Sequence, residues 1–320
     1  MKNKFLTVPL LLSLLTACTT QSYFEKVYKF FDATLFGYQY EGEKNYLTKI
    51  NDVFYYLNND TDNYKAHGKG IYEINQDNNV HEISKDLYDL LNKSLIYQDA
   101  FGGKFNIFVG LLAKKWQESL DNKLVLPPNV ISEEVNKIRN TSLELSISNG
   151  VYTAKRIGEA EIDLGAIAKG YALDLAKDVF INNGVNKYLI NGISSILLGE
   201  NIRNSGDFRI DFNDIEGKCF YAKNTFIGTS GTTERGVTID GVTYSHIVNP
   251  ITGSVINNYD MAYVIANNGA LADALSTTFM ISTVDEVKSL VDKFGAQALL
   301  YNDGEIVYKT EGFVIKDING

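Results

Sequence analysis

Apolar residues recur at helical spacing in several parts of the chain. The clearest case follows Ser84, where an acidic first turn precedes four leucines that share one face, the pattern of a capped amphipathic helix. Similar patterns predict further helices at residues 46–57, from Ser132 onward, and at 171–183, 270–281 and 284–294. The helix at 171–183 ends at Asn183-Gly184, a common C-terminal stop.

Short runs bounded by turn residues predict strands between and after these helices. One hairpin is predicted to turn at Ser148-Asn149-Gly150, another at Asp240-Gly241, and a third around Asn302-Asp303-Gly304. Helices and strands do not alternate regularly along the chain. The predicted fold class is therefore α+β, with mixed or antiparallel sheets and flanking helices.

The composition is that of an ordinary globular protein of 320 residues, 45% hydrophobic and 22% charged. No long low-complexity linker divides the chain, so we expect one domain at about residues 31–315. The formal net charge of −9 argues against nucleic acid as the main partner, because binding to phosphates needs clustered lysine and arginine.

The first 18 residues carry the features of an export signal. Two lysines precede an apolar run from Phe5 to Leu15, which is shorter than a membrane-spanning helix. Small residues then lead to Cys18, and this arrangement resembles a bacterial lipobox. The resemblance implies a signal peptide at 1–17, acylation of Cys18, and a lipid anchor and short tether at 18–30 that hold the protein on the extracytoplasmic side of the cell membrane. An ordinary secretion signal with an incidental cysteine is the alternative.

The second cysteine, Cys219, lies in a short apolar stretch that is typical of a strand. We predict that it is a small buried hydrophobic residue rather than a reactive thiol. If Cys18 carries lipid, no intrachain disulfide can form.

Residues 161–172 predict a short strand, a loop of small residues and then the start of a helix that carries Lys169. Backbone N–H groups and the positive end of the helix dipole suit a phosphate at such a junction, and Lys169 adds a cation. The spacing matches neither a P-loop nor a dinucleotide-binding fingerprint. A tight structural turn with a solvated lysine is therefore the alternative.

Asp273 and Thr277 are four residues apart in a predicted helix and share a face, with small residues around them. A carboxylate and a hydroxyl in this arrangement can supply oxygen ligands to Mg²⁺. The alternative is that Asp273 only complements the dipole at the start of its helix.

Two further segments combine turn residues with chemically useful side chains. His246, one of three histidines, precedes the turn-forming string Asn249-Pro250-Ile251-Thr252-Gly253, and Thr229-Ser230-Gly231 lies upstream. Gly102-Gly103, which allow close approach of a ligand to the backbone, precede Phe105 and Asn106.

These segments, in this order, resemble the signatures of the ApbE-like flavin transferases, which move FMN from FAD onto a hydroxyl of a partner protein. The similar strings are Gly-Gly-Lys-Phe-Asn from Gly102, Asp-Leu-Gly-Ala-Ile-Ala-Lys-Gly-Tyr-Ala from Asp163, Thr-Ser-Gly from Thr229, Ser-His-Ile from Ser245 and Ala-Asp-Ala-Leu-Ser-Thr from Ala272. The chain departs from the family pattern at residues 191–195, where Gly-Gly-(Asp/Asn) is frequent, at Thr232-Thr233, and at 32–37.

The resemblance implies a Mg²⁺-dependent enzyme with FAD as its substrate. It implies Asp273, Thr277 and the Ala166 carbonyl as metal ligands. Positions that match FAD-binding groups of the family are Phe105, Asn106, Asp163, Lys169 and Ile247. Lys169 would hold negative charge at the cleaved linkage. A Ser or Thr hydroxyl of an extracytoplasmic acceptor protein would attack the phosphorus on the FMN side, and AMP would leave. His246 is the candidate general base, with Asp273 as the rival.

Three other functions remain open on the sequence. The same site could hydrolyse FAD to FMN and AMP, with water as the acceptor. A non-catalytic flavin-binding lipoprotein would have a pocket without a metal requirement, and this reading leaves Asp273 and Thr277 unexplained. A surface interaction lipoprotein without a small-molecule site leaves all the motifs unexplained.

Overall fold

The computed structural model describes residues 23–201, 206–212, 214–232 and 236–318. The expected signal peptide at 1–17 and Cys18 lie outside these ranges. Within them, no helix is long and apolar enough to cross a membrane.

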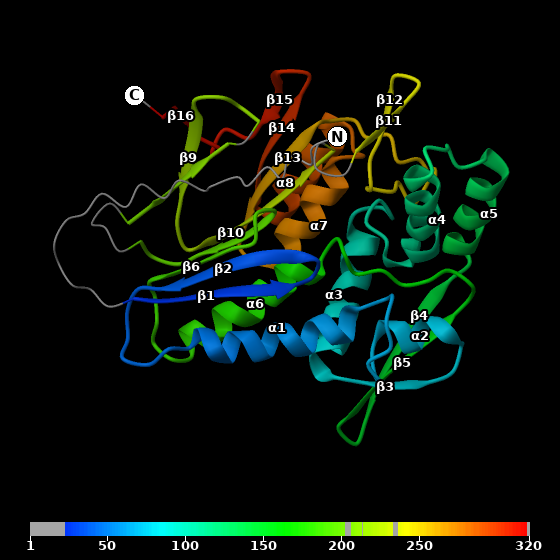
Figure 1. Cartoon of the computed structure of the whole chain (residues 1–320), viewed down its shortest axis with the longest axis horizontal. Helices are drawn as coiled ribbons and strands as arrows, with labels where there is room; N and C mark the ends of the chain where they lie inside the picture. Colours follow the sequence, from blue (N-terminus) through cyan, green and yellow to red (C-terminus); the bar gives the residue numbers. More distant parts are fainter. Residues whose placement is uncertain (1–22, 202–205, 213, 233–235, 319–320) are drawn as a thin grey trace.

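An antiparallel sheet forms the centre of the described chain (Figure 1). Its eight described strands, in spatial order, are β1 (Phe24–Phe30), β2 (Ala33–Gln39), β6 (Tyr188–Asn191), β7 (Ser195–Leu198), β10 (Thr225–Gly231), β13 (Met261–Ala266), β14 (Gln297–Asn302) and β15 (Glu305–Lys309). Each neighbouring pair runs antiparallel.

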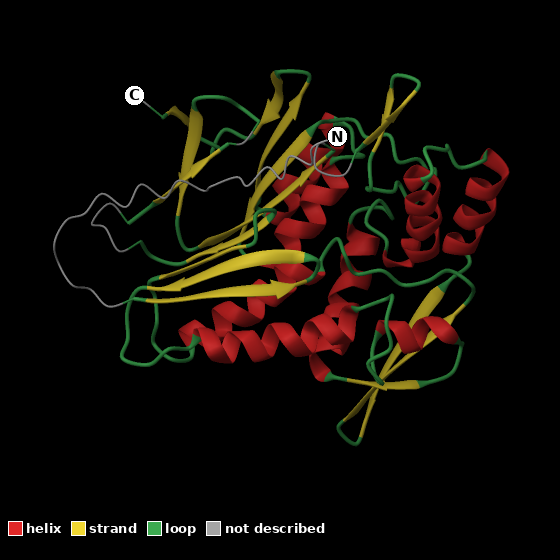
Figure 2. Ribbon diagram, in the orientation of Figure 1, coloured by secondary structure: helices red, strands yellow, loops and turns green. Residues whose placement is uncertain are grey.

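Helices cover one face of this sheet, and a small sheet covers the other (Figure 2). The helices that contact the main sheet are α1 (Leu47–Thr61), α6 (Ala168–Ile181), α7 (Gly269–Phe279) and α8 (Val284–Phe294). The small sheet consists of β8 (Phe208–Asp211), β9 (Lys218–Ala222) and β16 (Ile315–Asp317). Phe212, Phe220 and Phe313 pack together with strand residues of the main sheet in this second core.

The remaining elements form a group that lies apart from the main sheet, on the right in Figure 1. It contains α2 (Ile71–Gln76), α3 (Lys85–Ala100), the 3-10 turn η1 (Ile107–Val109), α4 (Gly110–Asp121), α5 (Pro128–Arg139) and a sheet of β3 (His81–Ile83), β5 (Val151–Ile157) and β4 (Ser142–Ser148). A separate hairpin, β11 (Val237–Ile239) and β12 (Val242–Tyr244), follows β10.

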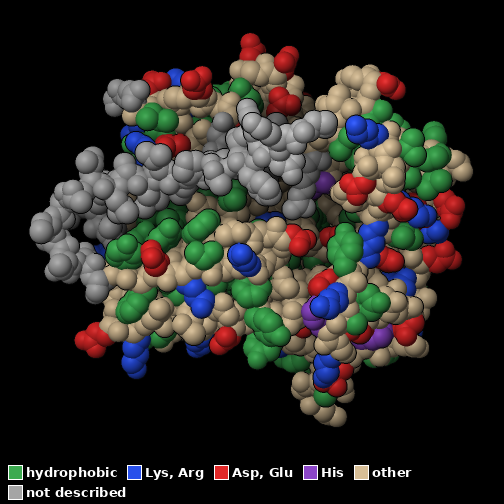
Figure 3. Space-filling model, in the orientation of Figure 1, with side chains coloured by type: hydrophobic (Ala, Val, Ile, Leu, Met, Phe, Trp, Pro, Cys, Tyr) green, Lys and Arg blue, Asp and Glu red, His purple; other side chains and the backbone are tan. Residues whose placement is uncertain are grey.

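Much of the sequence prediction is confirmed. The fold is α+β, the three predicted hairpins are present, and α8 spans Val284–Phe294 as expected. The Ser84 side chain caps α3 by accepting a hydrogen bond from the Leu87 N–H. Cys219 is fully buried in β9. Lysines and acidic residues alternate on the face shown in Figure 3, without a broad basic patch.

Several details of the local structure were predicted wrongly. The tether was expected to reach residue 30, but Phe24–Phe30 is a strand of the main sheet because its residues pair with β2 along their whole length. Residues 161–163 form no strand. The α5 helix begins at Pro128, not Ser132, since a proline is well suited to a first helical turn. The α6 helix begins at Ala168, three residues before the predicted start at 171. Its first turn is fixed by a close contact with α7.

The α6 and α7 helices touch backbone to backbone at two glycines. A Cβ atom on Gly170 would lie 2.0 Å from the carbonyl oxygen of Gly269, and a Cβ on Gly269 would lie 2.2 Å from that of Gly170. On its other side α7 packs equally closely against β10, where a Cβ on Gly228 would lie 2.3 Å from the Ala272 carbonyl oxygen. Glycine is therefore required at all three positions, and α7 is held between α6 and the sheet.

Gly170→Ala should lower the free energy of unfolding by about 3 kcal/mol, because the new methyl group must push the two helices apart. Gly184→Ala is the control: Gly184 has a positive φ but no atom near its added Cβ, so only about 1 kcal/mol of backbone strain is expected there. Urea unfolding of both variants measures the difference. Equal losses in the two would contradict the proposed role of close helix contact.

Candidate active site

Asp273 and Asp174 each bind the start of the helix opposite to their own. On α7, Asp273 accepts a hydrogen bond at Oδ2 from the Gly170 N–H of α6 (2.6 Å). On α6, Asp174 accepts from the N–H groups of Gly269 (2.6 Å) and Ala270 (3.2 Å) at the start of α7. A carboxylate at a helix N-terminus is stabilised by unpaired N–H groups and by the helix dipole. The two helices therefore fix one another through their acids.

Asp273 also receives a hydrogen bond from the sheet. The Ser195 hydroxyl, on β7, donates to Asp273 Oδ1 at 2.8 Å, and both residues are buried. Ser195 lies directly opposite Gly228 on β10. Since Gly228 has no side chain, the backbone of α7 can come close enough for this contact.

Burial raises the pKa of Asp273 to about 6, because removal from water disfavours the charged form. The positive charge of Lys169 and the hydrogen bonds from Ser195 and Gly170 oppose this rise. Lys169 is half-buried in the first turn of α6. Its charge thus acts on Asp273, which places the two predicted site residues in one electrostatic environment.

Thr277 lies one turn after Asp273 and is half-buried, whereas every other residue of α7 is buried. Its hydroxyl is 3.3 Å from the Ser230 hydroxyl at the end of β10. Ser230 is in turn 2.9 Å from the hydroxyl of Ser276. The predicted common face of Asp273 and Thr277 is therefore oriented towards hydroxyls of the main sheet.

The loop before α6 has its backbone bonded by side chains from distant parts of the chain. The Asn75 amide both donates to the Ile162 carbonyl (2.9 Å) and accepts from the Ile162 N–H (2.8 Å), as a neighbouring strand would. The Asn63 amide donates to Asp163 Oδ2 at 2.9 Å, and the Gly165 N–H donates to Asp163 Oδ1 at 2.6 Å. Asp163 therefore shapes this loop, and Asn75 takes the place of a strand partner at Ile162. The main chains of Glu161 and Asp163 bond to Gly110 and Ile107 instead.

Ala166 belongs to the same corner of the molecule. In an α-helix the Gly170 N–H would bond to the carbonyl of Ala166, four residues earlier. Here that N–H bonds to Asp273 instead, and the first bond of α6 runs from Tyr171 to Ile167. The turn that carries Ala166 therefore lies outside α6, and Asp273 accepts the N–H that would otherwise bond to the Ala166 carbonyl.

Phe105 and Asn106 have well-defined structural contacts. Phe105 is 4% exposed and packs edge-on against Tyr97 and Phe101. The Asn106 side chain caps η1 by accepting from the Phe108 N–H at 2.8 Å. Phe105 thus contributes to the core, with little surface open to a ligand.

His246 is exposed, between two residues that are buried. The Ser245 hydroxyl bonds to the Asn257 side chain and accepts from the Ile247 N–H, while Ile247 itself is 5% exposed. Trp116 also holds the end of this loop by donating to the Gly253 carbonyl at 2.8 Å. His246 therefore projects from a segment that is fixed on both sides.

The chain matches the model of the ApbE family over residues 24–300. The chain belongs to the ApbE family. A FAD:protein FMN transferase of Treponema pallidum (strain Nichols) is 27% identical over 252 residues, which are 72% of this chain and 70% of that protein. A protein of the same name from Rhodobacter capsulatus is 25% identical over 237 residues, 70% of this chain but only 44% of its own length.

The fold is that of the ApbE family as well. The crystal structure of the ApbE protein from Thermotoga maritima has a TM-score of 0.74 with this chain, and the match covers 92% of this chain and 97% of that one at 23% identity. The resemblance drawn from the motifs is thereby confirmed at the level of family and fold.

The structure brings several of the family motifs into one place. Asp273, Lys169 and the turn of Ala166 meet at the start of α6, with Thr277 one turn further along α7. The residues that hold these groups in place could not be predicted from the sequence. Ser195 and Asn75 carried no local signal, because their partners Asp273 and Ile162 lie 78 and 87 residues away. Ser230 was noted only as part of Thr-Ser-Gly.

One departure from the family pattern has a clear backbone consequence. Ile193, in the turn between β6 and β7, has a φ of +67°, which a β-branched residue rarely adopts. Its side chain is 54% exposed. The turn nevertheless delivers Ser195 to Asp273, so the strain at Ile193 is tolerated next to a functional contact.

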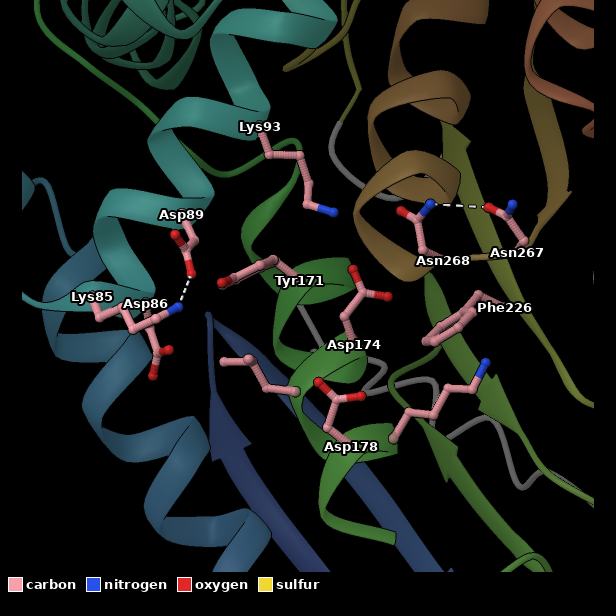
Figure 4. A pocket seen from close by; sticks show the side chains of 12 residues that line it. Lys85, Asp86, Asp89, Lys93, Tyr171, Asp174, Asp178, Phe226, Asn267 and Asn268 are labelled. Carbon is pink, nitrogen blue, oxygen red and sulfur yellow. Dashed lines mark hydrogen bonds and ion pairs between the residues drawn. The ribbon is translucent and has the colours of Figure 1, made fainter. Parts of the chain in front are cut away.

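A cavity of about 550 Å³ opens at the N-terminal end of α7 (Figure 4). Lys93 of α3 and Asp174 of α6 point into it, and Asn268 lies at its edge. Burial raises the pKa of Asp174, and the hydrogen bonds from Gly269 and Ala270 and the charge of Lys93 oppose this rise. None of the site residues predicted from the sequence lines this cavity.

Asp273→Asn should change how stability depends on pH in EDTA solution. The folded-state pKa of Asp273 is raised from 3.8 to about 6, so its stabilising contribution is complete below pH 4 and is lost as pH rises past 6. Asparagine does not ionise, so Asp273→Asn does not lose stability in this way as the pH rises. Its free energy of unfolding relative to the unchanged protein should therefore rise by about 2–3 kcal/mol between pH 4 and pH 7.5.

Urea titrations at several pH values measure this difference. Asp121→Asn, at the exposed end of α4, controls for the removal of one acidic side chain. A constant difference between Asp273→Asn and the unchanged protein across the pH range would show that burial of Asp273 has no such cost.

Proposed function

We propose that the protein transfers FMN from FAD to a Ser or Thr hydroxyl of an acceptor protein and releases AMP. The observation that carries the proposal is the junction of α6 and α7, where Asp273, Lys169 and Thr277 come together in a chain of the ApbE family. The relatives in Treponema pallidum and Rhodobacter capsulatus bear the name of this activity. Transfer of a phosphoryl group depends mainly on positioning and charge neutralisation, which these residues can supply.

The donor set fits Mg²⁺. Asp273 offers a carboxylate whose two oxygens each accept one hydrogen bond, and each oxygen keeps a further lone pair. Thr277 adds a hydroxyl and Ala166 a carbonyl, so all the donors are hard oxygens. No cluster of three or more His, Cys, Asp or Glu side chains suited to a metal occurs in the described part of the chain. A single carboxylate suits Mg²⁺, which takes its other ligands from substrate phosphates and water.

When bound, Mg²⁺ would neutralise negative charge on the diphosphate of FAD. Lys169 would bind the same diphosphate. The N–H groups of Ile167, Ala168 and Gly170 already bond to Leu164 and Asp273. The α6 terminus is therefore less of an anion site than its sequence indicates, and phosphate binding depends more on Lys169.

His246 is the better candidate for the general base that takes the proton of the attacking hydroxyl. It is exposed, and an imidazole is a common acceptor of protons in enzymes. Both oxygens of Asp273 are engaged by donors, and a carboxylate that also binds Mg²⁺ accepts protons poorly. Asp163, Asn106 and Ile247 would act on FAD through the loops that they shape.

We also propose that Cys18 carries lipid and that the protein faces the extracytoplasmic side of the cell membrane. The support is the run from Phe5 to Cys18, in which an apolar core and small residues precede the cysteine. An acceptor protein would then be met on the same side of the membrane.

The full-length protein in detergent, given FAD, Mg²⁺ and an acceptor peptide with a Ser/Thr-Gly-Ala-Thr-like string, should add the mass of one FMN to the peptide. EDTA and Asp273→Ala should both abolish the gain, since EDTA removes the metal and the substitution removes its carboxylate ligand. Intact-mass spectrometry measures the product. Free FMN and AMP without a modified peptide would indicate hydrolysis instead, and full activity of Asp273→Ala would exclude its role as a ligand.

His246→Ala should slow transfer by about 10²–10⁴-fold, as expected for loss of a general base, while FAD affinity is unchanged. The rate comes from the same mass assay and the affinity from flavin fluorescence. Loss of FAD binding would make His246 a substrate-binding residue.

Cys18→Ser should abolish incorporation of labelled palmitate in a bacterial host and release the protein from the membrane fraction. Cys219→Ala, which changes the buried cysteine of β9, should keep both the label and the membrane location. A Cys18→Ser protein that still carries label would overturn the lipid assignment.

A further inference from the structure

We propose that Ser195 and Ser230, hydroxyls on two neighbouring strands of the main sheet, are positioning residues that orient Asp273 and Thr277 as metal ligands. This inference rests on the proposed function, because it assumes that these two residues of α7 bind Mg²⁺. It concerns residues whose side chains would not touch the metal themselves.

Two donors hold the carboxylate of Asp273. Asp273 Oδ1 accepts from the Ser195 hydroxyl (2.8 Å) and Oδ2 accepts from the Gly170 N–H (2.6 Å). These two donors come from different elements, β7 and α6, so they fix the plane of the carboxylate. Ser195 is 1% exposed, so its hydroxyl bonds to Asp273 out of contact with solvent. The lone pairs that remain on Asp273 therefore have a fixed orientation, which favours tight binding of a small cation.

The hydroxyls of Ser276, Ser230 and Thr277 form a chain in which the hydrogen bonds can run in one direction only. The Ser276 hydroxyl donates to the Asp273 main-chain carbonyl at 3.0 Å, and a carbonyl can only accept. A hydroxyl has a single hydrogen, so Ser276 must accept from Ser230 across their 2.9 Å contact. Ser230 has then used its own hydrogen.

It follows that Ser230 can only accept from Thr277, at 3.3 Å. The hydrogen of Thr277 is thus directed towards the sheet, and its oxygen lone pairs are left for a ligand. A threonine that binds a cation needs this orientation. The contact is long for a hydrogen bond between hydroxyls, so Ser230 should direct Thr277 more weakly than Ser195 directs Asp273.

The sheet is built for both contacts. Ser195 lies opposite Gly228 in the register of β7 and β10, and Ser230 follows two residues after Gly228 on β10. Residues two apart in a strand point to the same face. Gly228 lets the α7 backbone approach, and the serines on either side of it then reach the two ligand residues.

The test measures binding of Mn²⁺ alone to the full-length protein, by loss of the free Mn²⁺ signal in electron paramagnetic resonance. Ser195→Ala should weaken the affinity by about 10–100-fold, and Ser230→Ala by about 10-fold or less. Ser195→Thr and Ser230→Thr, which keep the hydroxyl, should restore affinity to within about threefold. Asp273→Ala sets the level expected without the site.

Ser194→Ala is the matched control. Ser194 lies in the same turn as Ser195, and its contacts with Gly192 and Thr229 are made by its main chain. Ser194→Ala should bind Mn²⁺ like the unchanged protein. Thermal melting in EDTA, recorded for every variant, identifies any that fail to fold, and for those the threonine variant supplies the comparison.

Three outcomes overturn the inference. These are binding of Mn²⁺ by Ser195→Ala with the affinity of the unchanged protein, a loss of affinity in Ser194→Ala as large as that in Ser195→Ala, and no binding of Mn²⁺ by the unchanged protein. The FMN-transfer assay distinguishes failure of the proposed function: an unchanged protein that transfers FMN while Ser195→Ala binds Mn²⁺ normally refutes only the positioning role. A protein that binds Mn²⁺ as expected but modifies no acceptor refutes only the transferase.

Discussion

The rest of the site depends on the contact between α6 and α7 at Gly170 and Gly269. With no side chains between them, the two backbones meet and each helix start lies within reach of an acid on the other helix. Asp174 satisfies the first N–H groups of α7, and Asp273 satisfies one at the start of α6. A side chain at either glycine would separate the helices and break both contacts.

The same closeness explains the electrostatics of Asp273. A carboxylate that is nearly free of water would ordinarily be strongly destabilised, and burial does raise its pKa. The Gly170 N–H, the Ser195 hydroxyl and the charge of Lys169 offset part of that cost. An acid with few competing waters and a defined orientation is suited to hold a cation. The protein therefore keeps a costly buried charge where its chemistry needs one, a pattern common at functional sites.

In the loop at 161–165, side-chain amides supply hydrogen bonds that a neighbouring strand would supply in a sheet. Asn75 pairs with both polar groups of Ile162, and Asn63 bonds to Asp163. Arg156, which is buried, adds hydrogen bonds to the carbonyls of Ile74, Asn75 and Asp77 and to those that follow β5. The elements apart from the main sheet thus set the path by which the chain enters α6.

The sequence alone determined the helices with strong apolar periodicity, the hairpins with their turn residues, and the motifs that identify the family, because each depends on residues close together in the chain. It also placed Asp273 and Thr277 on one face, since helical spacing is local. The tertiary structure decided the start of α6, the absence of a strand at 161–163, and the pairing of Ser195 with Asp273. Those features depend on hydrogen bonds between residues about 80 to 100 positions apart, which no local pattern encodes.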